Sequence, residues 1–294
     1  MNSSDVKKCA TDHGADLVGI ASIKHFKDLP MDENPLCIAP ECKSVIVLGR
    51  RILRGALRGI EEGTNFFSTY GFFGFQALED NFLSQTIYDT TCFIETFGFE
   101  AVPLFGYSKE GMATGVPVAE GKPAPNVFVN INYAAHAAGL GELGRGDFFL
   151  TKKYGPRQRF SMILTDAELE PDPVFKDSIC DQCGKCAAIC PFNAINMEKE
   201  ETIGIVPNEM KIAKIDYNIC RSCPNGAMMG PGRGTKPDRL GAACARACMI
   251  KLEEDSVCDN KFIYPFRKRT PWILDAFLRP PAGGGDIGGA RKTN

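Results

Sequence analysis

The spacing of the cysteines between residues 180 and 190 constrains this chain more than any other feature. The segment reads C-x2-C-x2-C-x3-C-P, and three cysteines two residues apart can bind three irons of one [4Fe–4S] cube. The fourth cysteine follows a longer gap, points away and binds a second cluster. The motif therefore predicts a second set of cysteines elsewhere in the chain. Its own cysteines are Cys180, Cys183, Cys186 and Cys190.

The second set follows downstream with an irregular spacing. Cys220 and Cys223 form one pair, and Cys244 and Cys248 keep the three-residue gap. Gly241 stands where a regular repeat would place another cysteine. Because two cubes need eight thiolates, we predict that Cys223 supplies the missing ligand. One cluster then uses Cys180, Cys183, Cys186 and Cys248, and the other uses Cys190, Cys220, Cys223 and Cys244.

Other roles for the cysteines can be compared with this one. Cys258 is a further cysteine that could replace one of the eight ligands. Zinc needs only four cysteines in two C-x2-C pairs and has no use for the third step of this motif. Disulfide frameworks are typical of short secreted chains, whereas this chain has 294 residues and a polar start at 1–10. We therefore expect iron and a reducing, cytoplasmic compartment. Inert buried thiols are expected at Cys9, Cys37, Cys42 and Cys92.

The composition is that of a soluble globular protein. Hydrophobic residues make up 44% and charged residues 24% of the chain, and no apolar run approaches the ~18 residues that span a bilayer. The net charge of −2 argues against a nucleic-acid partner. Residues 261–294 are an exception, with seven Lys or Arg against two Asp. They form either a solvated tail or a contact surface for tRNA or an acidic ferredoxin.

Short apolar strands and amphipathic helices alternate in residues 1–173, which predicts an α/β domain. Residues 44–49 are the clearest strand, and their continuous apolar character suits a strand covered on both faces. Ser4 is expected to cap the first helix. The remaining predicted elements are helices at 4–12, 77–97 and 132–140 and strands at 16–21, 100–104 and 160–165. The strand at 100–104 contains a proline and is expected at a sheet edge.

Two irregular segments interrupt these elements. Residues 55–75, rich in Gly and Phe, are expected to form a loop that either packs or walls a flat cofactor. Residues 106–126 are either a lid over a pocket or a solvent loop. An acidic, proline-flanked linker then leads to a two-cluster domain. The predicted division is a cofactor- and substrate-binding domain at 1–173, a cluster domain at 174–260 and the tail at 261–294.

A glycine-rich run, GLGELG at 139–144, lets the backbone approach a ligand closely. Its spacing matches the dinucleotide fingerprint, but it follows an alanine-rich helix instead of a strand, so that interpretation fails. Three stretches, at 138–145, 153–157 and 164–166, precede the linker and the cysteines. In this order they resemble the epoxyqueuosine reductase and reductive dehalogenase superfamily.

The resemblance implies an α+β protein with a nitroreductase-like α/β domain followed by a ferredoxin-like double [4Fe–4S] domain. It implies that a corrinoid (cobalamin) lies in the first domain and that electrons pass through the clusters to its cobalt. An electron donor such as ferredoxin or flavodoxin and a small-molecule substrate are implied as partners. By resemblance, the residues against the corrinoid are Gly139, Leu140, Gly141, Gly144, Arg145, Tyr154 and Gly155, with His136 either packed or facing the cofactor.

The catalytic acid is less defined. Epoxyqueuosine reductases carry an aspartate shortly before the glycine motif, whereas residues 126–133 contain no acid, which argues against epoxyqueuosine as the substrate. Reductive dehalogenases use a tyrosine aided by a basic residue. Tyr133 or Tyr107 could serve, with Arg145 lowering the tyrosine pKa, or both could simply pack with bonded hydroxyls. An electron carrier without a corrinoid, which docks a partner protein, and a flavin in place of the corrinoid remain alternatives.

Overall fold

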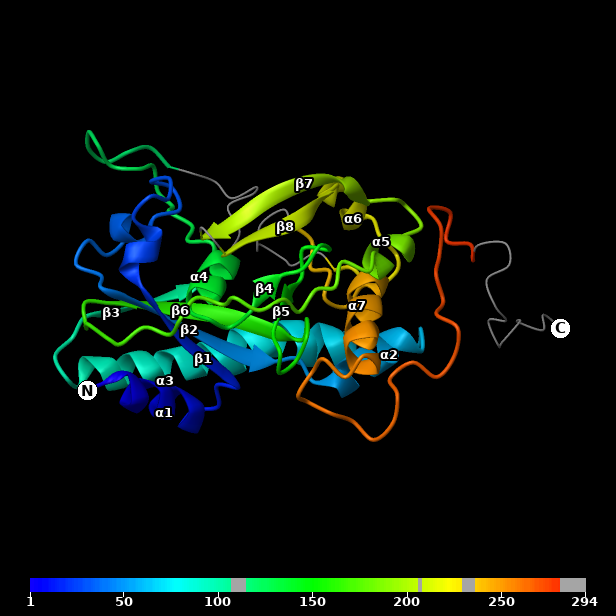
Figure 1. Ribbon diagram of the computed structural model, residues 1–294, viewed down its shortest axis with the longest axis horizontal. Coiled ribbons are helices and arrows are strands. Elements are labelled where there is room, and N and C mark those ends of the chain that lie inside the picture. Colours follow the sequence, from blue (N-terminus) through cyan, green and yellow to red (C-terminus); the bar gives the residue numbers. More distant parts are fainter. Residues whose placement is uncertain (107–114, 206–207, 229–235, 281–294) are drawn as a thin grey trace.

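A four-stranded antiparallel sheet organises the first half of the chain in the computed structural model, which describes residues 1–106, 115–205, 208–228 and 236–280 (Figure 1). The strand order is β1-β2-β6-β3, so β3 lies at an edge as predicted. In the pairing of β2 with β6, Val47 lies opposite Met162. The strands are β1 (Leu17–Ser22), β2 (Ser44–Arg51), β3 (Ala101–Phe105) and β6 (Gln158–Thr165).

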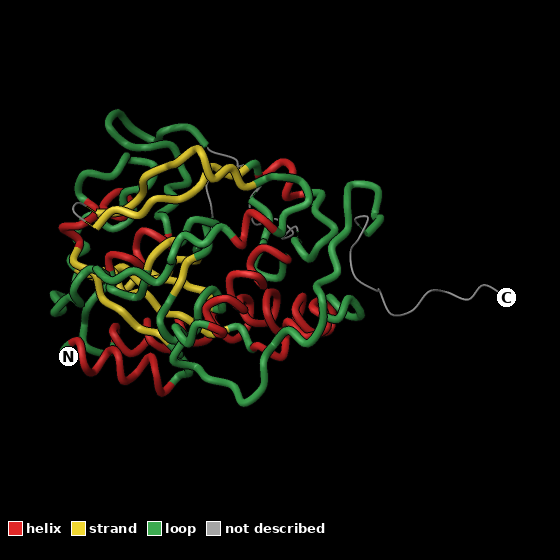
Figure 2. Tube along the Cα trace, turned by 45° about the vertical axis from the view of Figure 1, so that its right-hand side comes forward, coloured by secondary structure: helices red, strands yellow, loops and turns green. Residues whose placement is uncertain are grey.

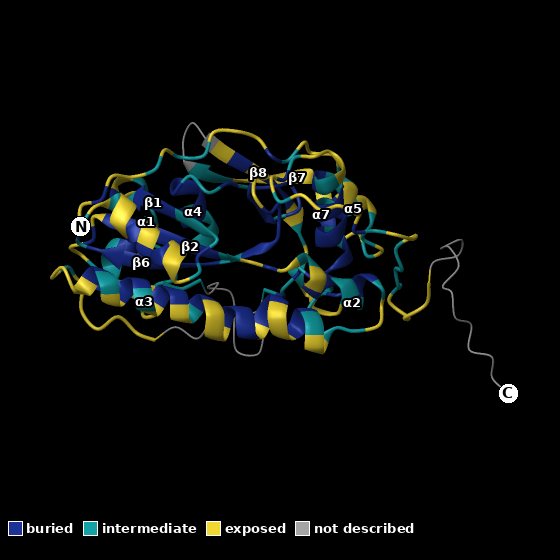
Figure 3. Ribbon diagram, turned by 90° about the horizontal axis from the view of Figure 1, so that it is seen from below, coloured by how far each residue is buried: buried dark blue, intermediate teal, exposed yellow. Residues whose placement is uncertain are grey.

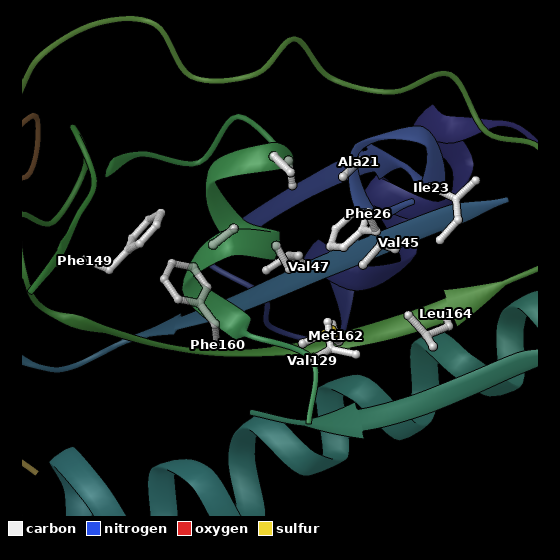
Figure 4. Packing of buried hydrophobic residues seen from close by; sticks show 14 of the residues in the cluster. Ala21, Ile23, Phe26, Val45, Val47, Val129, Phe149, Phe160, Met162 and Leu164 are labelled. Carbon is white, nitrogen blue, oxygen red and sulfur yellow. The ribbon is translucent and has the colours of Figure 1, made fainter. Parts of the chain in front are cut away.

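Both faces of this sheet are buried. Because side chains alternate along a strand, Val45 and Val47 point to one face and Ile46 and Leu48 to the other. The first face packs against helix α4 (Ile131–Ala137), and Figure 4 shows Val45, Val47 and Met162 within this cluster. The expectation of a doubly covered strand is therefore confirmed.

The opposite face is covered by helices α1 (Ser3–Asp12) and α3 (Ser84–Glu95). Figure 3 shows the buried and exposed stripes of α3. Helix α1 begins one residue earlier than predicted, because Asn2 and not Ser4 caps it. The Asn2 side chain accepts from the Asp5 amide, and Asp5 accepts from the Asn2 amide, which satisfies two amides that a helix start leaves unpaired.

The expected loop at 55–75 is largely helical. After the short helices η3 (Arg54–Leu57) and α2 (Arg58–Glu61), wide-turned π-helical segments run over η4 (Phe67–Gln76) and η5 (Leu78–Leu83) into α3. The loop was predicted because glycine has a low helix propensity. Gly74 packs against the ring of Tyr70, which is completely buried, so the tertiary structure stabilises a helix with low intrinsic propensity.

The cysteine-rich part consists of short helices and one long hairpin. Figure 1 shows this hairpin above α4, with the helices at its far end. After α7 the described chain continues as loop, which Figure 2 shows passing outside the helices. The remaining elements are η1 (Ile23–Phe26), η2 (Pro35–Cys37), β4 (Glu142–Leu143), β5 (Phe149–Leu150), α5 (Lys185–Ala188), β7 (Ile195–Ile205), β8 (Asn208–Ile215), α6 (Tyr217–Arg221) and α7 (Ala243–Glu254).

Contacts join the two halves of the chain. Met210 and Ile212 of β8 pack into the cluster on the α4 face of the sheet. Met249 and Ile250 of α7 pack with Tyr70 and its neighbours. In the described part of the chain, no helix has the length and apolar character that crossing a bilayer requires. The predicted α+β class is confirmed.

Candidate iron–sulfur centres and the adjoining cavity

The four cysteines of the motif lie on a tight turn, on the one-turn helix that follows it and just after that helix. Gln182 and Gly184 both have positive φ, and the Asp181 side chain accepts from the Cys183 amide at 3.0 Å. The chain then enters α5, which contains Cys186. Cys190 follows α5, so the change of direction at the helix end separates it from the other three.

Four cysteines border one small cavity: Cys180, Cys183, Cys186 and Cys248. Cys248 comes from α7, which packs against α5. Burial raises the pKa of Cys186 to about 11, and the thiols of Cys244, Cys180 and Cys183 add to the shift. These four are the ligands predicted for one cluster. Since thiols alone do not identify a metal, the assignment stays a prediction.

The other four predicted ligands are close enough to shift the pKa of Cys220, which is one of them. Burial raises the pKa of Cys220 to about 11, and the nearby Cys244, Cys190 and Cys223 thiols add to this effect, whereas Arg239 opposes it. Asp216 caps α6, the helix that carries Cys220, by accepting from the amides of its first turn. The structure therefore brings the predicted ligands together as two neighbouring groups of thiols, and α7 contributes one cysteine to each group.

Cys258 lies apart from the second group. Its thiol is buried and borders a different cavity together with Arg54 and Phe262. Burial raises its pKa to about 11, and no cysteine is among the described groups that shift it further. It does act on the pKa of Cys248, so it lies beside the first group. This placement favours Cys223 over Cys258 as the ligand in the second group.

Among the residues that the structure describes, no three His, Cys, Asp or Glu side chains converge closely enough to hold a single metal ion. A cubane cluster does not need such convergence, because each of its four thiolates binds a different iron. The remaining cysteines differ from the expectation of buried thiols in two cases. Cys92 is exposed and Cys37 is half-buried, whereas Cys9 and Cys42 are buried as predicted.

The glycine-rich run packs against the first cysteine group. The Arg145 amide lies 3.4 Å from the Cys180 sulfur, and a Cβ atom at Gly146 would lie 3.0 Å from the Cys186 sulfur. Gly139 and Gly141 approach backbone carbonyls of this chain so closely that neither position has space for a Cβ atom. Close packing therefore accounts for these glycines, and their predicted contact with a corrinoid stays a prediction.

The other residues predicted for the corrinoid have partners within the chain. His136 is buried, with Nδ1 at 2.9 Å from the Gly141 carbonyl oxygen. Tyr154 is buried and its hydroxyl lies 3.4 Å from Asp16. Leu140 packs against the cluster on the α4 face, and Gly155 lies beside Cys258.

The two candidate catalytic tyrosines have different outcomes. Tyr107 lies outside the described residues. The Tyr133 hydroxyl donates to the His25 carbonyl at 2.5 Å, and burial raises the pKa of Tyr133. Arg145 pairs with Glu200 and does not act on Tyr133, so the expected lowering of the tyrosine pKa by Arg145 is wrong for Tyr133. The catalytic role of Tyr133 stays a prediction.

A cavity of about 330 Å³ lies where the sheet meets the cysteine-rich part. One wall comes from the sheet and β5. The other comes from residues 236–240, which lie between Cys223 and α7. Figure 4 shows two of its aromatic residues, Phe149 and Phe160, whose ring centroids are 5.2 Å apart. The phenylalanines that line it are Phe75, Phe105, Phe128, Phe148, Phe149 and Phe160.

One buried charge network lies at this wall. Arg159 forms an ion pair with Asp238 at 2.8 Å and with Glu79 at 3.4 Å. The Tyr70 hydroxyl donates to Asp238 at 2.6 Å and accepts from Arg159 at 2.9 Å. Burial raises the pKa of Tyr70 well above its usual value. The network therefore holds a protonated phenol and paired charges beside the cavity.

A second network lies on the side of the cysteines. Asp147 pairs with Lys236 at 2.8 Å and with Arg239 at 3.6 Å, and Tyr217 donates to the same carboxylate. Burial alone would raise the pKa of Asp147, but the two cations outweigh burial and lower it. Burial raises the pKa of Tyr217 to about 12.

The cavity adjoins both groups of thiols. Phe148 borders it on one side and borders the small cavity of the first cysteine group on the other. Arg239 also lines the large cavity, and the nearby Cys244 and Cys220 thiols raise its pKa. The Arg239 guanidinium lies 4.6 Å from the centroid of the Phe148 ring. These two side chains therefore separate the cavity from the sulfurs.

These cavity residues were not predicted from the sequence. Two signals could have identified them: Arg159 is the one charged residue of β6, and Lys236, Asp238 and Arg239 are clustered between Cys223 and Cys244. Neither signal shows which residues would face one another, because their partners lie far away in the sequence.

Comparison with known proteins supports the two-cluster prediction. The model of the 4Fe-4S dicluster domain family matches residues 179–252. A tetrachloroethene reductive dehalogenase of Desulfitobacterium hafniense is 32% identical over 138 residues, 46% of this chain and 21% of that protein. The protein of the same name from Sulfurospirillum multivorans is 27% identical over 176 residues, 58% of this chain and 30% of that protein.

This chain therefore spans less than a third of the length of these curated relatives. The solved structure of the catabolic reductive dehalogenase NpRdhA matches 96% of this chain and 40% of its own, with 19% identity and a TM-score of 0.53. That likeness supports the fold. Together these matches confirm the predicted resemblance to the superfamily and the expectation of two [4Fe–4S] clusters.

Proposed function

We propose that this chain, an iron–sulfur relative of the reductive dehalogenases, is a reductase in which two [4Fe–4S] clusters deliver electrons to a corrinoid that reduces a small molecule. The dicluster domain and the names of the relatives support the iron–sulfur and reductase parts of the proposal. One cluster is held by Cys180, Cys183, Cys186 and Cys248. The other is held by Cys190, Cys220, Cys223 and Cys244.

A single observation carries the proposal: both thiol groups adjoin the same aromatic cavity. Phe148 is the wall next to the first group, and Arg239 is the wall next to the second. Iron–sulfur clusters transfer single electrons, so a reaction that needs two requires a site beside at least one of the clusters where both electrons can be collected. The cavity is a candidate for such a site, and its presence supports a reductase over an electron carrier.

The chemistry of the cavity fits a flat macrocycle in two respects. Six phenylalanines provide apolar walls, and Asn132 and Gln158 provide amide groups that can orient polar substituents. When bound, a corrinoid supplies a cobalt centre that accepts electrons and passes them to the substrate. The phenylalanines exclude water, while Tyr70, held by Asp238 and Arg159, keeps its proton beside the cavity wall.

The packing of the glycine run favours the second candidate, an electron carrier without a corrinoid. Gly139 and Gly141 contact this chain on the side where a side chain would project, although the resemblance implied that they face the cofactor. A carrier would need an exposed cluster, and Cys183 is exposed. An electron donor such as ferredoxin or flavodoxin fits either candidate.

Cobalamin retention separates the two candidates. Protein purified without oxygen and reconstituted with iron and sulfide is incubated with cobalamin and then desalted. The reductase should retain a corrinoid spectrum with about eight irons per chain. Asn132→Trp, which narrows the cavity, should lower retention without loss of iron, whereas Gln85→Trp on the exposed side of α3 should change neither. Wild-type protein with eight irons that retains no corrinoid would support the carrier.

A further inference from the structure

Arg239 occupies the boundary between the second cysteine group and the cavity. Its side chain is almost entirely buried and lines the cavity wall. The guanidinium also lies near Cys244 and Cys220, since both thiols act on its charge. A cation at this point is within electrostatic reach of any cluster that these thiols hold.

The hydrogen bonds of this guanidinium are incomplete among the described residues. Nη2 donates to the Gly146 carbonyl at 2.8 Å and lies 3.2 Å from the Asp147 carbonyl. Nη1 is buried and has no hydrogen-bond partner within the part of the chain that the structure describes. Buried N–H groups are normally paired, and hydrogen bonds to the sulfurs of a cluster are among the factors that set its reduction potential.

We propose that Arg239 donates from Nη1 to a sulfur of the second cluster and raises the reduction potential of that cluster. This inference rests on the ligand set of the proposed function. A cluster becomes more negative when it gains an electron, so a nearby cation stabilises the reduced form. One electron then leaves the first cluster and reduces the second, which lies next to the cavity. Arg239 is thus a positioning residue for electron transfer.

Other buried arginines are less suited to this role. Cys244 also opposes the lowering of the Arg246 pKa by burial. However, Glu61 pairs with the Arg246 guanidinium at 2.8 Å and compensates its charge. Arg159 is paired with Asp238 and Glu79, and no cysteine is among the described groups that shift its pKa. The carboxylate nearest Arg239, Asp147, is shared with Lys236 at 2.8 Å. The charge of Arg239 is therefore less fully compensated.

The test is a redox titration of the protein with both clusters, followed by electron paramagnetic resonance. Arg239→Gln should lower the midpoint potential of one cluster and leave the other unchanged. Arg239→Lys, which keeps a charge without the planar fork, should lower it less. Asp147→Asn removes the compensating carboxylate, so it should raise the potential of the same cluster. Arg159→Gln removes a buried cation from the same cavity wall and should move neither potential.

Iron content separates this inference from the proposed function. If wild-type protein holds fewer than about eight irons, the ligand set itself fails. With eight irons, unchanged potentials in Arg239→Gln would overturn the inference alone. An equal shift of both clusters, or a comparable shift in Arg159→Gln, would also overturn it. Where Arg239→Gln does not fold, Asp147→Asn decides, because an unchanged or lowered potential in that variant contradicts the role of Arg239.

Discussion

The phenol of Tyr70 donates a 2.6 Å hydrogen bond to Asp238, a residue 168 positions later in the chain. Tyr70 belongs to η4, and Asp238 lies in the loop between Cys223 and α7. Arg159 of β6 binds both groups. Three distant segments therefore meet at one wall of the cavity, and this junction fixes the cysteine-rich part against the sheet.

Removal of the Tyr70 hydroxyl should weaken this junction. Tyr70→Phe leaves the ring in place but deprives Asp238 of a donor and Arg159 of an acceptor. We expect the free energy of unfolding to fall by about 1–3 kcal/mol, the cost of leaving buried polar groups unpaired. Anaerobic denaturant unfolding measures it. Tyr88→Phe, on the exposed face of α3, is the matched control and should leave stability unchanged. Equal stability of both variants would contradict this account.

The ion pair between Glu61 and Arg246 joins α2 to α7, the helix that carries Cys244 and Cys248. The two charges are 2.8 Å apart and buried, and Arg267 also contacts Glu61 at 2.6 Å. Glu61→Gln leaves the Arg246 charge without a counter-ion, which should cost about 3–5 kcal/mol. Trp272, the sole tryptophan of the chain, donates to the Ile60 carbonyl and reports the loss by fluorescence. Arg58→Gln, which breaks a more exposed pair, should cost less than about 1 kcal/mol.

The same carboxylate predicts a pH dependence. Burial would raise the pKa of Glu61, but Arg267 and Arg246 outweigh burial and lower it. A carboxylate with a lowered pKa contributes stability above its ordinary pKa of about 4.3, and this contribution is lost as the pH falls through the lowered value. The stability difference between wild type and Glu61→Gln should therefore be constant above about pH 5 and shrink below about pH 4. A difference that grows in acid would contradict the assigned direction.

Iron content tests the choice between Cys223 and Cys258. Cys223→Ala should reduce iron from about eight towards about four per chain, because one cluster loses a ligand. Cys258→Ala should retain about eight, since Cys258 lies outside the second thiol group. The opposite pattern would assign the ligand role to Cys258. Zinc in place of iron in the wild-type protein would remove the basis for both assignments.

Gly146 should be sensitive to the smallest side chain. A Cβ atom there would lie 3.0 Å from both the Cys186 sulfur and the Phe148 ring. Gly146→Ala is therefore expected to displace Cys186 and to lower the occupancy of the first cluster, measured as iron per chain. Gly55→Ala is the control, because no described atom lies within 4 Å of the position of its Cβ atom. Full iron content in Gly146→Ala would show that the loop can relax.

Much of the fold follows from local patterns. The strand at 44–49, the helix ending at Asp12 and the edge strand at 100–104 were all predicted, because hydrophobic periodicity and turn residues act over a few positions. The helical character of 67–76 was not predicted. Its glycines and aromatic residues disfavour a helix locally, and the burial of Tyr70 overrides that preference.

The sequence alone predicted eight cysteine ligands and their division into two groups, because the geometry of a cubane cluster imposes short spacings, which the first set of cysteines shows in the chain itself. The tertiary structure decided which residues share the cavity. Tyr70, Arg159 and Asp238 are brought together across 168 positions by packing of the sheet against the cysteine-rich part. Such contacts have no spacing rule, since burial of apolar surface, and not local geometry, brings distant segments together.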